Sequence, residues 1–446
     1  MSAQICQTMA LLMRSTCCHA IKNRSCLHKA VLLHVASSGV CVPWAPACHK
    51  RAYSLDPIFS GPGCPTLGTS SQQACAEKTP PSSSVTHRNL SAVAVQDQRC
   101  PTSRYDFLDL GETETNTKRI QARKNRKYLI ADPDLAALVT EYLRPKDDKT
   151  IFFECNPGPG VLTRTLLNTG AQRVVALEGD KFFLRDLQEL EGRLDGQLDV
   201  VHCDFFKMDP FGVGSVNPPA MFTDILFTHL GISKTAWTDD IPVKIFGIMP
   251  QNKERGLLLK MIYALFEQLS FYTYGRVELN LFISEKEYVK LLSQPGDMQN
   301  YRACSVLWQM ACEIELLHKE PRGSFLMSSS KAKKCDKDNL CLVRLRPRAD
   351  LFSAGLTPFN APALLMMVKQ CLVKRKIKLI DRLNPWSPDS GSKLLSEMGM
   401  QEDVLTGHVF PEEYLRLFQL MDKSQDFNQS WLYKEMLENT ERNGWC

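Results

Sequence analysis

Short apolar runs alternate with amphipathic segments between residues 150 and 340, a pattern typical of a mostly parallel α/β sheet. The spacing predicts strands at 151–153, 174–177, 200–202, 241–249, 276–283 and 341–345. Helices are predicted at 134–143, 162–168 and 256–270, where apolar residues recur with helical spacing. After Pro347 the pattern is mostly helical, with segments at 362–373, 391–398, 411–421 and 430–437. We therefore expect an α/β domain followed by a small all-helical C-terminal domain.

The chain before residue 118 has no sustained apolar period. Residues 1–53 contain six basic residues and no acid, with short apolar patches interrupted by Arg, Lys and His, which is typical of a mitochondrial transit peptide. Residues 54–117 are rich in Ser, Pro, Gly and Thr and are expected to be a disordered linker. The predicted organisation is completed by an α/β domain at 118–346 and a helical domain at 347–446.

The composition bears on three classes of protein: those that bind nucleic acid through overall charge, those that span a membrane and those that hold a metal ion. The net charge is +5, but residues 54–446 carry 48 basic against 49 acidic groups, so the whole positive excess belongs to the first 53 residues. Overall charge is therefore no argument for nucleic-acid binding. The sequence contains no run of about 18 apolar residues, so we expect no transmembrane helix. The 17 cysteines lack zinc-ligand spacing, so we expect no metal site and mostly reduced, buried thiols.

A glycine-containing turn and two acids follow successive predicted strands. Residues 154–160 (ECNPGPG) leave the first strand and open a helix, where glycines allow a ligand close to the backbone. Glu178 ends the next strand, where a carboxylate can accept both ribose hydroxyls. Asp204 follows the third strand, within reach of an adenine amino group. The ordered set predicts a nucleoside pocket, which by itself fits NAD or S-adenosylmethionine equally.

These motifs resemble the rRNA adenine dimethyltransferase family. Residues 154–163 (ECNPGPGVLT) are similar to its E-x-G-P-G-x-G-x-L-T motif, residues 175–180 to its second motif and residues 202–206 to its third. Residues 126–129 (RKYL) stand where the family has Q-N-F-L. The resemblance implies a class I methyltransferase fold with a seven-stranded sheet, and S-adenosyl-L-methionine as cofactor. It also implies the cofactor-binding residues, which are Leu129, Gly158, Glu178 and Asp204.

The departures from the family pattern concern the chemistry. Asn156 replaces the first motif glycine. The family's N-L-P-Y motif supplies a hydrogen-bond acceptor for the target amine and a ring that stacks on the flipped adenine. The matching residues here are Ile248, Met249, Pro250 and Gln251, which lack both features. Phe205 and Phe206 offer a substitute ring, although a core role is favoured for both. We expect weak methylation or none, with no confident catalytic residue.

Three local basic patches are candidates for phosphate contact. The first is 118–127, with six basic residues and no acid, and the third is Lys374–Lys378. The second lies within 331–348, and its expected nucleic-acid-binding residues are Lys331, Lys333, Lys334, Lys337 and Arg344. For a single patch a solvated charged face is the commoner explanation, but three patches around a nucleoside pocket favour nucleic acid.

A nucleoside pocket with an eroded catalytic motif, behind a mitochondrial presequence, resembles the mitochondrial members of this family that act in transcription. The resemblance implies a transcription initiation factor in the mitochondrial matrix and nucleoid that helps mitochondrial RNA polymerase melt promoter DNA. An HMG-box mitochondrial transcription factor would be the further partner. The alternative is an active rRNA adenine N6-dimethyltransferase acting on a small-subunit rRNA hairpin.

Overall fold

The computed structural model describes residues 108–113, 127–145, 150–210, 216–327, 338–386, 390–424, 427, 429–430 and 433–434. The expected transit peptide, nearly all of the linker and most of the helix expected at 430–437 lie outside these residues. Within them the element order alternates strands and helices up to Pro347 and is helical afterwards.

Seven strands form one sheet in the order β3-β2-β1-β4-β5-β7-β6. The strands are β1 (Ile151–Cys155), β2 (Val174–Leu177), β3 (Leu198–Val201), β4 (Val243–Ile248), β5 (Glu278–Ser284), β6 (Cys312–Pro321) and β7 (Asn339–Pro347). β1 to β5 pair in parallel, and β7 pairs antiparallel with both β5 and β6. This is the mostly parallel, class I methyltransferase sheet that the sequence predicts. β6 is the strand that the sequence pattern does not predict.

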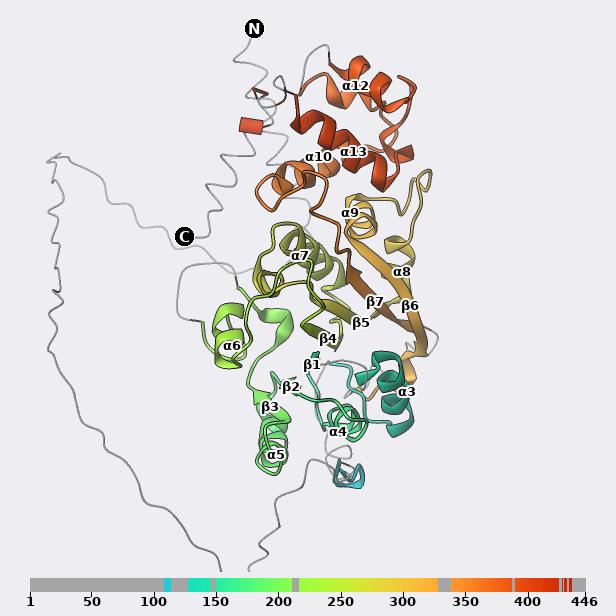
Figure 1. Cartoon of the computed structure of the whole chain (residues 1–446). Helices are drawn as coiled ribbons and strands as arrows, with labels where there is room; N and C mark the ends of the chain where they lie inside the picture. The colour runs from blue at the N-terminus through green and yellow to red at the C-terminus, as the bar shows by residue number, and fades with distance from the viewer. Residues whose placement is uncertain are drawn as a thin grey trace, which may run out of the picture. The chain divides into compact units, whose positions relative to one another are not determined.

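The helices cover both faces of the sheet (Figure 1). Those before Pro347 are α3 (Pro133–Leu143), α4 (Val161–Asn168), α5 (Lys181–Glu191), α6 (Thr223–His229), α7 (Glu254–Phe266), α8 (Glu285–Leu291) and α9 (Ala303–Ala311). Side chains alternate along β1, so Phe152 packs with α3 and α4 while Phe153 packs with α6 and α7. A near-continuous apolar run therefore produces a strand that is buried on both faces.

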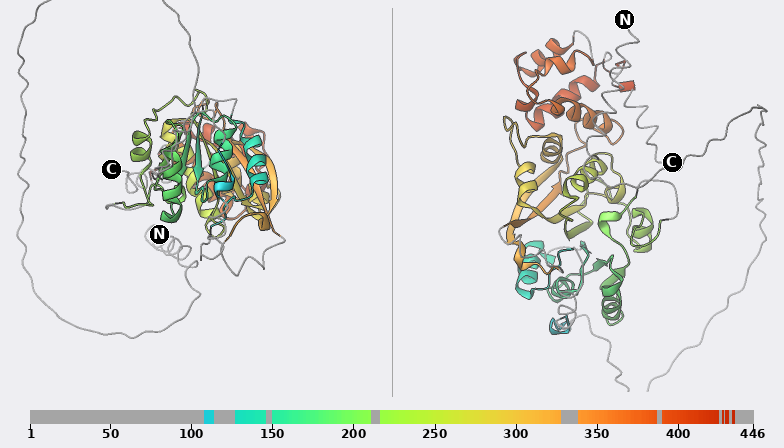
Figure 2. Two further views of the ribbon diagram at one scale, coloured as in Figure 1. Left: turned by 90° about the horizontal axis from the view of Figure 1, so that it is seen from below. Right: turned by 180° about the vertical axis from the view of Figure 1, so that it is seen from behind.

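The helices after Pro347 gather at one end of the sheet (Figure 2). They are α10 (Ala361–Val373), α11 (Ile380–Leu383), α12 (Gly391–Met398) and α13 (Pro411–Asp422). α10 and α13 pack on α9, and their buried side chains belong to the same apolar cluster as those of β4 and α7. Trp308 of α9 is fully buried, and its Nε1 donates to the Leu258 carbonyl (3.2 Å). Residues from both expected domains therefore share one core.

Candidate functional site

The carboxyl ends of β1, β2, β3 and β4 meet at one edge of the sheet, because all four strands are parallel. Ligands of open α/β sheets bind at this edge. The turn after β1, Glu178 after β2, Asp204 after β3 and the residues after β4 all lie there. The structure thus brings together the predicted cofactor-binding residues.

The turn after β1 is shaped by left-handed backbone at three positions. Asn156, Gly158 and Gly160 have φ values of 56°, 61° and 77°. A Cβ on Gly158 would stand only 2.9 Å from Leu129 Cδ1, so glycine is required both for its φ and for this close approach. Leu129 is buried, and its backbone exchanges two hydrogen bonds with Leu326 (3.0 and 2.9 Å). The predicted pair Leu129 and Gly158 is therefore a packed contact.

Glu178 is almost wholly buried, with 1% of its surface exposed. Its Oε2 accepts from the Gly158 backbone N–H (2.9 Å) and its Oε1 from the Asp180 N–H (2.6 Å). Burial raises the pKa of this carboxyl, while these two hydrogen bonds and nearby Lys127 act to lower it. Glu178 thus ties the turn after β1 to the end of β2.

Asp204 has its side-chain oxygens engaged within the chain. Oδ1 accepts from the Phe206 backbone N–H (3.2 Å), and Oδ2 pairs with Lys127 Nζ (3.2 Å). Lys207 Nζ lies 3.7 Å from the same Oδ2, with over half of its side chain exposed. The acid predicted to meet an adenine amino group is therefore an ion-pair partner in this structure.

Lys127 also donates to Asn156 Oδ1, so its ammonium links the turn after β1 to Asp204. A Cβ on Gly179 would stand 3.2 Å from Lys127 Nζ and 3.5 Å from Asn156 Oδ1. The ammonium therefore lies over the end of β2, between Asn156 and Asp204, where the sequence predicts a nucleoside. The sequence predicts Lys127 to lie in the first basic patch, and residues 126–129 stand where the family has Q-N-F-L. Two departures from the family motifs together indicate that Lys127 and Asn156 contact each other: Lys127 stands at the family's Asn position, and Asn156 stands at its first glycine.

Glu154, the acid that begins the turn motif, is buried on the face of β1 that packs against α4. The Thr163 hydroxyl donates to its Oε2 (2.6 Å) from α4. Burial raises its pKa to about 8, with Glu178 adding to the increase and the Thr163 hydrogen bond opposing it. Glu154 and Thr163 therefore form a neutral buried pair near neutral pH, which joins β1 to α4.

The residues after β4 form a bonded network instead of a base-binding face. Met249 is fully buried, and its backbone N–H donates to the Phe282 carbonyl (3.0 Å). Gln251 Nε2 donates to Glu254 Oε1 (2.8 Å), and Arg322 donates to Gln251 Oε1 (2.8 Å). Glu254 in turn accepts from the backbone N–H and hydroxyl of Ser284 (2.7 and 2.6 Å). The side chain at the family's stacking position is thus held by its neighbours.

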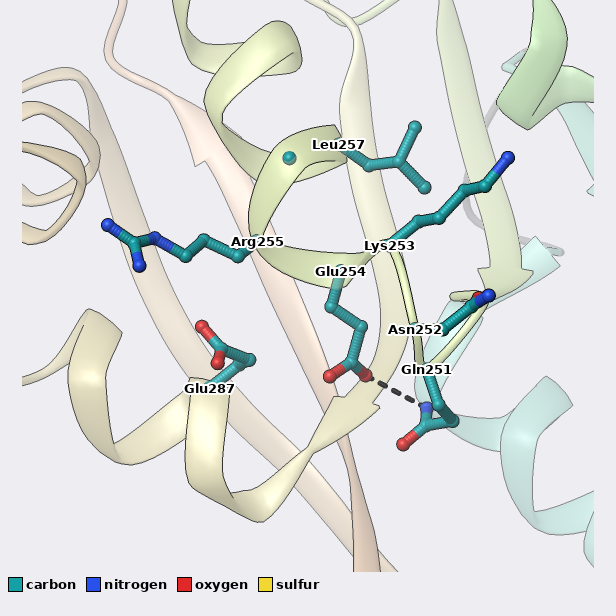
Figure 3. A pocket seen from close by; sticks show the side chains of 8 residues that line it. Gln251, Asn252, Lys253, Glu254, Arg255, Leu257 and Glu287 are labelled. Carbon is teal, nitrogen blue, oxygen red and sulfur yellow. Dashed lines mark hydrogen bonds between the residues drawn. The ribbon is translucent and has the colours of Figure 1, made fainter. Parts of the chain in front are cut away.

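A pocket of about 380 Å³ lies beside this network, lined by residues 251–257 and Glu287. Figure 3 shows the hydrogen bond between Gln251 and Glu254 among the lining side chains, with Lys253 extending away from them. Phe206 lies beside Gly247 of β4: its ring would be 3.4 Å from a Cβ on Gly247, and it meets Phe205 edge-on, with 5.4 Å between the ring centroids. Phe205 is buried, as the favoured core interpretation predicts, whereas Phe206 is half-buried.

The predicted nucleic-acid contacts have different outcomes. Lys331, Lys333, Lys334 and Lys337 lie outside the described residues. Arg344 is mostly buried, pairs with Glu315 (2.6 Å) and Glu278 (3.5 Å), and donates to the Tyr142 carbonyl (2.7 Å). We therefore correct its expected role from phosphate contact to a structural one. In the third patch, Lys374, Lys376 and Lys378 are exposed.

Other chemistry is scarce in the described part of the chain. No group of three His, Cys, Asp or Glu side chains there is placed to hold a metal ion. Its six described cysteines are free thiols, and five of them are buried. None of the helices in those ranges is both long enough and apolar enough to span a membrane.

The model of the ribosomal RNA adenine dimethylase family matches residues 120–423. The chain belongs to this family. It is 40% identical over 348 residues to the bovine protein named dimethyladenosine transferase 2, mitochondrial, covering 75% of this chain and 88% of that one. The human protein of the same name is 40% identical over 334 residues, with 72% and 84% covered. A dimethyladenosine transferase structure from Plasmodium falciparum aligns with 16% identity and a TM-score of 0.47, covering 66% of this chain and 96% of that one.

The cofactor of this family is S-adenosylmethionine, and the site can be compared with its requirements. Gly158, Leu129, Glu178 and Asp204, the residues expected to bind the cofactor, lie together at this edge of the sheet. The space beside Asp204 does not fit a nucleoside as it stands, because the Lys127 ammonium occupies it.

Proposed function

We propose that this protein is a mitochondrial transcription initiation factor that assists the mitochondrial RNA polymerase in promoter melting. The observation that carries the proposal is the state of the residues after β4. Met249 is buried and Gln251 is bonded to Glu254 and Arg322. This edge of a retained methyltransferase fold therefore presents neither the amine acceptor nor the stacking ring of the family's chemistry.

A surface suited to phosphate supports a nucleic-acid role. Lys374, Lys376 and Lys378 are exposed at alternate positions of the segment that follows α10. Arg375, between them, donates to the Met298 carbonyl (3.0 Å) and fixes this segment against the rest of the fold. A fixed row of lysines binds phosphates without reading bases, which suits a factor that holds opened promoter DNA.

The proposed location is the mitochondrial matrix, in the nucleoid. The acid-free first 53 residues have the composition of a transit peptide, and both relatives above carry mitochondrial names. The partners we propose are the mitochondrial RNA polymerase, the HMG-box mitochondrial transcription factor and promoter DNA.

Photo-cross-linking to a pre-opened promoter, with polymerase present, tests this proposal. We expect labels in the unpaired strand to attach to the protein, and replacing Lys374, Lys376 and Lys378 together by Ala to reduce that labelling. A matched triple replacement of exposed Lys181, Arg185 and Lys393 by Ala controls for loss of charge. Labelling confined to duplex positions, or equal loss in both variants, would count against promoter melting by this surface.

The second candidate is an active rRNA adenine N6-dimethyltransferase acting on a small-subunit rRNA hairpin. It is favoured by the retention of Gly158, Glu178 and Asp204 at one sheet edge. It requires substitutes for the missing Asn and Tyr after β4, for which half-buried Phe206 offers only the ring.

A further inference from the structure

We propose that Lys127 is an internal occupant of the nucleoside pocket, so that S-adenosylmethionine and its analogues bind only after the Lys127 side chain swings out. In the protein without cofactor, the Lys127 side chain would then fill the space that the nucleoside takes in a cofactor-binding methyltransferase. This inference uses the family's cofactor but does not depend on the proposed role in transcription.

The first support is the position of the ammonium. Lys127 Nζ bonds to Asn156 Oδ1 and lies 3.2 Å from Asp204 Oδ2, so it spans the ends of β1 and β3. It also lies directly over Gly179 at the end of β2. A nucleoside that reached from Glu178 to Asp204 would have to pass through the same space.

The second support is the state of the two acids. Each of the four carboxylate oxygens of Glu178 and Asp204 already accepts from this chain, three from backbone N–H groups and one from Lys127. The backbone donors are fixed by the fold. The Lys127 bond is the one that a side-chain rotation can release, which would return Asp204 Oδ2 to an adenine amine.

The third support is that the lysine's backbone is anchored while its side chain has a route out. Leu129, two residues later, pairs through its backbone with Leu326, and Tyr128 packs edge-on against Phe325 (6.1 Å). About a third of the Lys127 side chain is exposed, against 6% of Asp204. Displacement therefore involves the side chain and not the strand-like segment that carries it.

The charge of the Lys127 ammonium also disfavours binding of the cofactor while the side chain stays in place. S-adenosylmethionine carries a sulfonium and an ammonium group, and a fixed ammonium in the pocket repels cations while it competes for the acid. S-adenosylhomocysteine lacks the sulfonium, and 5′-methylthioadenosine lacks the amino-acid end as well. A gain in affinity that extends to the last compound would show that the contested space is the nucleoside subsite.

Calorimetric titration of the full chain with S-adenosylhomocysteine and with 5′-methylthioadenosine tests the proposal. We expect Lys127→Ala and Lys127→Asn to bind both at least about tenfold more tightly than the wild-type chain. Lys207→Asn is the matched control, because Lys207 approaches the same Asp204 oxygen from the solvent side, at 3.7 Å. We expect its affinity to stay within about threefold of wild type. Unchanged affinity in both folded Lys127 variants, or an equal gain in Lys207→Asn, would overturn the proposal.

A second measurement uses the unaltered chain, in case the Lys127 variants fold poorly. Amine acetylation followed by mass spectrometry reports the relative reactivity of Lys127 and Lys207. Saturating S-adenosylhomocysteine is expected to raise the acetylation rate of Lys127 several-fold, because the ammonium leaves Asn156 and Asp204, with little change in the rate of Lys207. If S-adenosylhomocysteine binds and the acetylation rate of Lys127 does not change, the proposal is wrong.

Discussion

Replacing Arg344 by alanine is expected to lower the free energy of unfolding by about 3 kcal/mol and to leave the salt dependence of nucleic-acid binding unchanged. Arg344 lies on β7 with 14% of its side chain exposed, beside Glu278, which is 1% exposed. The pairing also extends to Glu315 of β6 and to the Tyr142 carbonyl at the end of α3. Removal of the arginine leaves a buried carboxylate with one fewer cation and three elements without their common donor.

Urea unfolding and DNA binding over a series of salt concentrations separate the two possible roles of Arg344. Lys376→Ala is the matched control, because Lys376 is exposed in the third basic patch. We expect that variant to keep its stability and to lower the slope of binding against salt by about one phosphate contact. If Arg344→Ala instead kept its stability and lost DNA affinity, the structural role assigned to Arg344 would be wrong.

Glu154→Gln is expected to remove a fall in stability that the wild-type protein shows between about pH 4.5 and pH 8. The folded-state pKa of Glu154 is raised to about 8 from an ordinary value of 4.5. Its contribution to stability is therefore fully present below pH 4.5, where both states are protonated. It is lost as the pH rises towards 8, because the unfolded state ionises first. The loss is on the order of 5 kcal/mol.

Unfolding free energies of both proteins across this pH range give the result as a difference, which cancels other titrating groups. Glutamine still accepts the Thr163 hydroxyl, so we expect similar stability at pH 5 and a more stable variant at pH 8. Glu189→Gln, an exposed acid on α5, is the control and should run parallel to wild type. Parallel curves for Glu154→Gln as well would show that Glu154 ionises normally in the folded protein.

The sequence predicts the buried parallel strands well, because such strands are continuous apolar runs. β6 is different. It lies at the sheet edge, exposes Glu313 and Glu315, and follows α9 without an intervening turn. It pairs with β7, the next strand in the chain, which begins after the connection 322–338. Cys312 and Ile314 alternate with Glu313 and Glu315, which is a short period-2 strand signal, but the residues that follow do not continue it and the pairing with β7 defines the extent of the strand.

The candidate site was predictable in its positions but not in its bonding. Strand-end placement was enough to bring Glu178, Asp204 and Gly158 together. The sequence places Lys127 and Arg344 in basic patches that are expected to contact phosphate, and it does not show which side chains pair within the chain. Which lysine or arginine turns inward is decided by a buried acid elsewhere in the chain, here Asp204 and Glu278. Their positions relative to the basic residues exist only in the folded protein.

Run-off transcription from a mitochondrial promoter, paired with methylation of a small-subunit rRNA hairpin, tests the central claim most directly. The reaction contains the mitochondrial RNA polymerase and the HMG-box factor, with and without this protein and without S-adenosylmethionine. We predict run-off that depends on this protein and is unaffected by added S-adenosylmethionine, with little or no hairpin methylation when that cofactor is supplied. Efficient hairpin dimethylation with no stimulation of transcription would contradict the account.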